Sequence, residues 1–148
     1  MKNILILLFL STLFTVGCSS SKNTTTSTTE SSTASQSGIN WNEASSLADA
    51  QAKTSDTRDK IFVDVSAVWC GYCKKMKKSV YTDDDVANAI NEKYIPLALD
   101  GEKGEGVSFA AKHKIKGYPT QLILDADGNV LKKNVGYLNV NQLLNFLK

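Results

Sequence analysis

The sequence predicts a single α/β domain in which helices cover both faces of a central mixed sheet. The chain has 148 residues, 42% of them hydrophobic, which is enough for one compact domain and too little for several. Two nearly continuous apolar runs, residues 61–65 and 95–99, are typical of strands buried on both faces. Segments with helical spacing lie before, between and after these runs.

Residues 1–17 are predicted to be a signal peptide outside the fold. A short basic start precedes an apolar stretch, residues 4–16, that is too short for a mature transmembrane helix. Cys18 follows the small residue Gly17, and this order resembles the bacterial lipoprotein signal, in which the cysteine is lipidated, although Thr15 departs from the usual aliphatic residue. The alternative is an ordinary secretory signal that leaves Cys18 free. Both interpretations predict that the mature protein leaves the cytosol.

Residues 18–38 are predicted to be a flexible tether. Fourteen of the twenty residues from 19 to 38 are Ser or Thr, so the segment cannot bury enough apolar surface to offset its ordering entropy. A coil of this length spans on the order of 25 Å. A glycosylated stalk is the alternative and would have the same mechanical role. The folded domain is therefore expected over residues 39–148.

Helices are expected beside both buried strands in the first half of the domain. Residues 41–55 carry apolar side chains at helical spacing, with Asn42 as the expected N-cap. A second helix begins near Cys70, and a third spans residues 83–93 behind Thr82 as its cap. Because a helical crossover joins the two strands, the strands are predicted to be parallel.

The second half of the domain is predicted to add a short helix, a hairpin and a last helix. The short helix covers residues 107–113. Strands over residues 120–124 and 129–135 are joined through an Asp-Gly turn, which favours an antiparallel hairpin. The last helix spans residues 140–147, and its packed stripe consists of Leu143, Leu144 and Leu147. Counting residues 70–93 as one crossover, the order is helix, strand, helix, strand, helix, strand, strand, helix.

The chemistry is concentrated in residues 69–73, Trp-Cys-Gly-Tyr-Cys, where the first buried strand ends and a helix begins. The free N–H groups and the macrodipole at a helix N-terminus stabilise a thiolate, so Cys70 is the expected nucleophile. Cys73 shares a helical stripe with Met76 and Val80, which predicts a less exposed, resolving thiol. A disulfide across so small a ring constrains the unfolded chain little, so a purely structural role accounts poorly for the pair.

The cysteine pair could also serve as a zinc site or consist of two thiols that are merely buried near each other. A structural zinc site needs four ligands, and besides the two cysteines the domain offers only His113, with Cys18 far along the tether. The motif, the helix start and the strand before it favour dithiol–disulfide exchange over both alternatives. No metal or cofactor beyond the Cys70–Cys73 pair is expected.

The charge distribution argues against nucleic acid as a partner. The formal net charge is only +2, and the basic side chains gather on one predicted helix. We interpret this cluster as a solvated helix face, with a docking patch for a partner as the alternative. It consists of Lys74, Lys75, Lys77 and Lys78.

Residues 63–74, VDVSAVWCGYCK, resemble the active-site strand and helix of thioredoxin. Residues 115–120 resemble the cis-proline loop of that family, and residues 135–137 and 142–147 resemble its last strand end and C-terminal helix. The resemblance covers residues 39–148 and implies a thioredoxin fold with an extra N-terminal helix. The Gly-Tyr spacer is more similar to secreted and envelope members of the family than to the cytosolic enzyme, which has Gly-Pro.

Asp64 matches the buried carboxylate that the family places near the resolving cysteine. Its apolar neighbours in the sequence suggest burial, which would raise the pKa of this carboxyl and fit it to accept a proton during thiol attack. The alternative is a carboxylate that reaches water at the end of the strand. The lysine that the family places opposite is absent, because Pro96 stands at the matching position.

The resemblance also implies a surface that contacts the substrate. Pro119 is the expected cis proline, and the backbone of Tyr118 would pair with an extended substrate segment. An ordinary trans turn is the alternative. Trp69, Gly71 and Tyr72 would flank the nucleophile as contacts, although aromatic residues beside a motif are often only packing.

The sequence therefore predicts a thiol–disulfide oxidoreductase that acts outside the cytosol on protein disulfides. Because the spacer lacks a histidine, reduction or isomerisation is favoured over oxidation. A membrane thiol reductant would supply the electrons, since the compartment is oxidising. We expect a monomer, lipid-anchored in a bacterial cell envelope and facing the periplasm or the exterior. The alternative is a non-catalytic lipoprotein of the same fold that binds a client protein or a soft metal.

Overall fold

The computed structural model describes residues 38–148; the predicted signal peptide, Cys18 and the tether up to residue 37 lie outside this range. The helices and strands of the described range are, in chain order, α1 (Leu47–Ala52), β1 (Lys60–Ser66), α2 (Gly71–Ser79), α3 (Asp84–Lys93), β2 (Tyr94–Asp100), α4 (Glu105–Lys112), β3 (Thr120–Asp125), β4 (Val130–Val135) and α5 (Val140–Phe146). Within residues 38–148, no helix has the length and apolar character that a bilayer crossing requires.

The four strands form one mixed sheet in the order β2-β1-β3-β4. β1 and β2 run parallel, as expected from the helical crossover between them, and β3 pairs antiparallel with both β1 and β4. The predicted hairpin is confirmed, and its turn uses Gly128 at φ +85°, a conformation that glycine adopts without strain. β2 is an edge strand with Ala98 exposed, so the prediction of burial on both faces is wrong at that residue.

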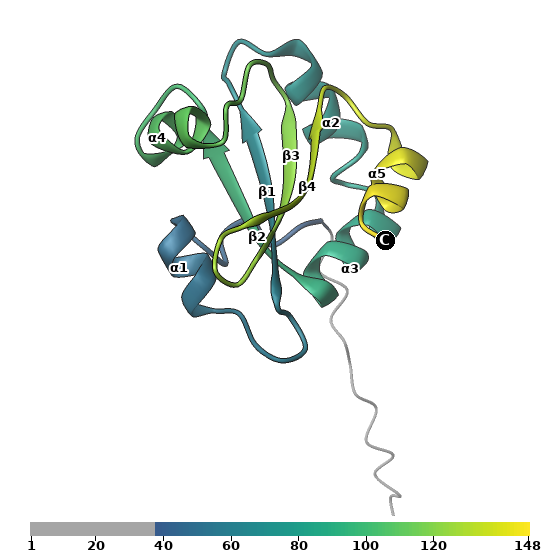
Figure 1. Cartoon of the computed structure of the whole chain (residues 1–148). Helices are drawn as coiled ribbons and strands as arrows, with labels where there is room; N and C mark the ends of the chain where they lie inside the picture. Colours follow the sequence, from purple (N-terminus) through teal and green to yellow (C-terminus); the bar gives the residue numbers. More distant parts are fainter. Residues whose placement is uncertain (1–37) are drawn as a thin grey trace, which may run out of the picture. The chain divides into compact units, whose positions relative to one another are not determined.

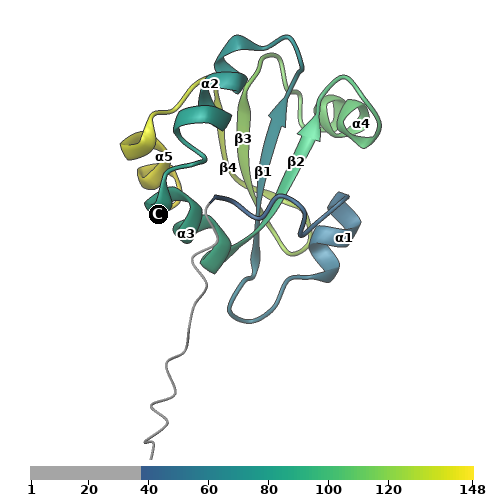
Figure 2. The same ribbon diagram turned by 180° about the vertical axis from the view of Figure 1, so that it is seen from behind.

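The helices lie on both faces of the sheet, with α1 and α4 on one side and α2, α3 and α5 on the other (Figures 1 and 2). β1 lies between two strands and is buried from its second residue to its last. Successive side chains of a strand point to opposite faces. Ile61, Val63 and Val65 therefore join the core beneath α1 and α4, whereas Phe62 joins the core beneath the other three helices.

The first helix is shorter than the sequence pattern predicts, and Asn42 is not its cap. α1 begins at Leu47, and the side chain of Ser46 accepts the N–H of Asp49 as N-cap. The apolar spacing of residues 41–55 does not mark one continuous helix, because Trp41 does not pack with the side chains of α1. Its ring lies 5.2 Å from that of Tyr81, in the core beneath α2 and α3.

The predicted cap of the third helix is also wrong by one residue. Asp83 caps α3, and its carboxylate accepts the N–H groups of Asp85 and Val86. A carboxylate is favoured at the positive end of a helix dipole. The hydroxyl of Thr82 instead donates to the carbonyl of Lys78.

Candidate active site

The two cysteines of the predicted motif form a disulfide at the start of α2. The sulfur atoms are 2.07 Å apart. Cys70 is the N-cap of α2, and its sulfur accepts the backbone N–H of Cys73 at 3.1 Å. The structure therefore places one sulfur where the free N–H groups of a helix point, which is the arrangement that stabilises a thiolate after reduction. Both residues are buried in the disulfide form, with 4% and 2% of their surface exposed, so the expected difference in exposure is slight.

Large apolar side chains lie exposed beside the disulfide. Val68, Trp69 and Tyr72 are 62%, 65% and 64% exposed. The indole N–H of Trp69 donates to the carboxylate of Glu102 at 3.0 Å, which fixes one exposed ring, and this partner was not anticipated from the sequence. Because exposed apolar groups that gather in one place are typical of interaction sites, this surface suits an incoming polypeptide.

Tyr72 of this exposed surface also pairs with a second aromatic ring. The rings of Tyr72 and Tyr137 are 6.0 Å apart, and the Lys75 ammonium lies 4.7 Å from the centre of the Tyr137 ring. Lys75 therefore contacts the aromatic surface rather than water alone. The remaining lysines of the basic helix face, Lys74, Lys77 and Lys78, are exposed.

The Tyr118–Pro119 peptide bond is cis, as the resemblance to thioredoxin implies. The Tyr118 side chain packs against the buried cluster of Ala67, Cys70 and Cys73, and its ring lies 6.0 Å from that of Trp69. It also lies so close to Gly101 that a side chain there would overlap its ring. Gly101 thus gives Tyr118 room beside the disulfide. Contact of Tyr118, Pro119, Trp69, Gly71 and Tyr72 with a substrate stays a prediction.

Asp64 is buried on the face of β1 that is covered by α2, with only 1% of its surface exposed. The alternative of a carboxylate that reaches water is therefore wrong. The hydroxyl of Tyr81 donates to its Oδ1 at 2.7 Å. Burial raises the pKa of the Asp64 carboxyl to about 6, against smaller lowering effects of Tyr81, Lys77 and Gln121.

The strand register corrects one detail of the position opposite Asp64. Asp64 pairs with Ala98 of β2, whereas Pro96 pairs with Phe62. A small neutral side chain therefore lies beside the carboxyl on this strand. The positive charge that acts on Asp64 comes from Lys77 of α2, whose ammonium group donates to the hydroxyl of Ser66 at 3.3 Å.

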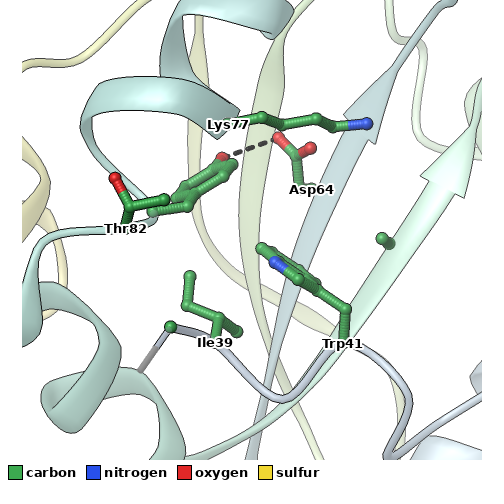
Figure 3. Close-up of a pocket in the computed structure, with 8 residues that line it drawn as sticks. Ile39, Trp41, Asp64, Lys77 and Thr82 are labelled. Carbon is green, nitrogen blue, oxygen red and sulfur yellow. Dashed lines mark hydrogen bonds between the residues drawn. The ribbon is translucent and has the colours of Figure 1, made fainter. Parts of the chain in front are cut away.

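A cavity of about 400 Å³ reaches Asp64 from the side of Trp41 (Figure 3). The cavity and two of the polar partners of Asp64 were missed by sequence reasoning. The sequence does indicate a role for Gln121, because a polar residue inside the apolar run 120–124 needs a polar partner. No sequence pattern indicates that Tyr81 contacts Asp64. The cavity is lined by Gly38, Ile39, Trp41, Asp64, Lys77, Tyr81, Thr82 and Ala98.

Comparisons with known proteins identify the family of this domain. The model of a thioredoxin-like domain matches residues 47–148. The chain belongs to the thioredoxin-like family. A thiol:disulfide interchange protein DsbD from Actinobacillus pleuropneumoniae is 30% identical over 106 residues, which cover 69% of this chain and 18% of that protein. A protein disulfide-isomerase 1 from Dictyostelium discoideum is 27% identical over 92 residues, 62% of this chain and 25% of that protein. The chain thus corresponds to a quarter or less of these relatives.

Solved structures confirm the predicted thioredoxin fold. A proposed disulphide-isomerase from Bacteroides thetaiotaomicron is 35% identical, has a TM-score of 0.64, and covers 74% of this chain with 89% of its own. A thioredoxin from Thermus thermophilus is 23% identical, has a TM-score of 0.59, and covers 74% of this chain with 82% of its own. The second likeness supports the fold alone. Together with the Cys70–Cys73 disulfide, the family places this chain among thioredoxin-like disulfide oxidoreductases.

Proposed function

We propose that this protein reduces or isomerises disulfides of other proteins through Cys70 and Cys73. The observation that carries the proposal is the Cys70–Cys73 disulfide at the N-terminus of α2, beside exposed aromatic side chains. The similarity to a thiol:disulfide interchange protein and to a disulfide-isomerase supports the same chemistry. The Gly-Tyr spacer lacks the histidine of strongly oxidising relatives, which favours reduction.

The reaction starts from the reduced protein. The Cys70 thiolate attacks one sulfur of the substrate disulfide, and a mixed disulfide forms while the other substrate sulfur leaves as a thiolate and takes a proton from water. The Cys73 thiol then gives its proton to the Asp64 carboxylate and attacks the Cys70 sulfur. The Cys70–Cys73 disulfide forms, and the second substrate sulfur leaves. The substrate gains two electrons, which a membrane thiol reductant would return to the protein.

Asp64 suits the role of proton acceptor by position. It faces α2 from the strand beneath, and Cys73 lies on the buried side of that helix. A carboxyl with a pKa near 6 can take a proton and release it again near neutral pH.

The experiment that tests the proposal compares two serine variants. Cys73→Ser should accumulate covalent mixed disulfides with client proteins through Cys70, whereas Cys70→Ser should trap few. Both variants should lose insulin reduction in an assay driven by dithiothreitol. Full activity in both would contradict the proposal, and a wild-type protein without turnover would favour the non-catalytic alternative. Among residues 38–148, no three His, Cys, Asp or Glu side chains gather to hold a metal ion.

The proposed location is a bacterial cell envelope, with the monomeric domain held at the membrane through a lipid on Cys18 and the Ser/Thr-rich tether. The support is the sequence order around Cys18 and the thiol:disulfide interchange proteins among the relatives. Cys18→Ala should release the protein from membrane fractions. Unchanged partitioning would argue against lipidation.

A further inference from the structure

Polar side chains gather beneath α2 in an otherwise apolar core. Asp64 of β1 stands directly opposite Gln121 of β3, and the hydroxyl of Tyr81 reaches Asp64 from the segment that joins α2 to α3. All three are buried, with 1%, 0% and 3% of their surface exposed. Because burial of a polar group is costly unless it is hydrogen-bonded, packing alone does not account for the hydroxyl and the amide.

The packing of the Tyr81 ring points its hydroxyl toward Asp64. Its ring packs edge-on against Trp41 at 5.2 Å and against Phe62 at 6.3 Å. Its oxygen lies 2.7 Å from Asp64 Oδ1, while its other contact, Met76 Sδ, is a weak acceptor at 3.9 Å. Burial raises the pKa of the Tyr81 hydroxyl well above its ordinary value. The hydroxyl therefore keeps its proton and acts as a fixed donor to the carboxylate.

Gln121 is oriented by contacts on both ends of its amide. Its nitrogen donates to Met76 Sδ at 3.2 Å, and its oxygen accepts from the Asn134 amide at 2.8 Å. The same Asn134 nitrogen donates to the carbonyl of Gly136 at 3.0 Å. The Gln121 amide therefore keeps its nitrogen toward α2, and it lowers the pKa of Asp64 as Tyr81 does.

Few other groups can act on Asp64. Among the described residues, β2 presents Ala98 and the N-terminal segment presents Ile39 and Trp41, all of them neutral. α2 presents Lys77, whose side chain passes over Asp64 in Figure 3. The titratable groups that line the Asp64 cavity are thus Lys77 and Tyr81, and of these two only Tyr81 donates a hydrogen bond to the carboxyl.

We propose that Tyr81 is a positioning residue: its hydroxyl holds the Asp64 carboxyl in the orientation and charge state that lets it take the proton of Cys73. The inference rests on the proposed function, which assigns the proton acceptor to Asp64. It adds a partner that the resemblance to thioredoxin does not supply, in a protein that lacks the expected lysine because Pro96 takes its place.

The test removes the hydroxyl and keeps the ring. In Tyr81→Phe, the charged form of Asp64 loses a donor, so its titration should move upward by about one pH unit. Carbon NMR of the carboxyl in the disulfide form measures this directly. The single-turnover rate of insulin reduction by the reduced protein should shift on the pH axis in the same direction. Tyr94→Phe is the matched control, because Tyr94 lies in the same core and donates to the carbonyl of Leu147 at 2.6 Å.

Each outcome separates this inference from the function on which it rests. A Tyr81→Phe titration at the wild-type position, or an equal shift in Tyr94→Phe, would overturn the role of Tyr81 alone. A wild-type pH profile in Asp64→Asn would overturn the role of Asp64 and the inference with it. If Tyr81→Phe does not fold, the wild-type hydroxyl proton of Tyr81 provides the test. Its NMR shift should follow the titration of Asp64 near pH 6 and lose this dependence in Asp64→Asn, and a shift that ignores Asp64 would refute the inference.

Discussion

The two faces of the sheet each bury a core, but the side chains in these two cores differ in polarity. Beneath α1 and α4, the core consists of aliphatic side chains and Phe109, with no carboxyl among its buried members. Beneath α2, the same central strand contributes Asp64, which meets Tyr81 and lies opposite Gln121. The first face stabilises the fold. The second places a titratable group beneath α2 at a cost in stability, which is typical of functional sites.

The largest effect is expected from a cavity on the apolar face. Leu122 is fully buried beneath α1 and α4. Leu122→Ala should lower the free energy of unfolding by about 2 to 5 kcal/mol. Denaturant unfolding at pH 5 and at pH 7 should give about the same loss, because no titratable group is removed. A loss that depends strongly on pH would contradict the division between the two faces.

On the sheet face beneath α2, a substitution of Asp64 is expected to raise the free energy of unfolding rather than lower it. The pKa of Asp64 is raised to about 6 in the folded protein, against about 3.9 in an unfolded chain. The folded state therefore binds the extra proton, and its stability falls as the pH rises from about 4 to about 6. Asp64→Asn removes this penalty and should raise the free energy of unfolding at pH 7 by about 2 to 3 kcal/mol. Below about pH 4 the variant and the wild type should converge. A destabilised variant at pH 7 would contradict the account of the buried carboxyl.

The smallest effect is expected at the surface beside the disulfide. A side chain at Gly101 would overlap the ring of Tyr118 and displace it from the cysteines. Gly101→Ala should therefore raise the KM for insulin by about two- to tenfold, the equivalent of one or two modest contacts. Oxidised glutathione is the internal control, since a small disulfide needs little of this surface. An equal loss with both substrates would indicate damage to the dithiol rather than to the contact surface.

The same contrast accounts for what could be predicted from the sequence. The apolar runs, the Asp-Gly turn and the Cys-Gly-Tyr-Cys motif are local patterns, and each predicted its element correctly. The burial of Asp64 followed from its apolar neighbours on the strand.

The missed features depend on contacts between distant segments. Trp41 has helical spacing but packs against Tyr81, so the first helix begins later than predicted. The Tyr81–Asp64 hydrogen bond spans 17 residues of sequence, and no periodicity reports it. The Glu102 carboxylate reaches Trp69 across 33 residues. Such pairs form only when whole helices and strands pack together, and local sequence patterns do not report this packing.

We expect the N-terminus of α2 to make Cys70 the reactive sulfur of the pair. The most direct test is the pH dependence of alkylation of the reduced protein by iodoacetamide, with the modified residue identified by mass spectrometry. Cys70 should react before Cys73 and should already be reactive at neutral pH. Reaction that begins only near the value of an ordinary thiol, about 8.5, or modification of Cys73 first, would contradict it.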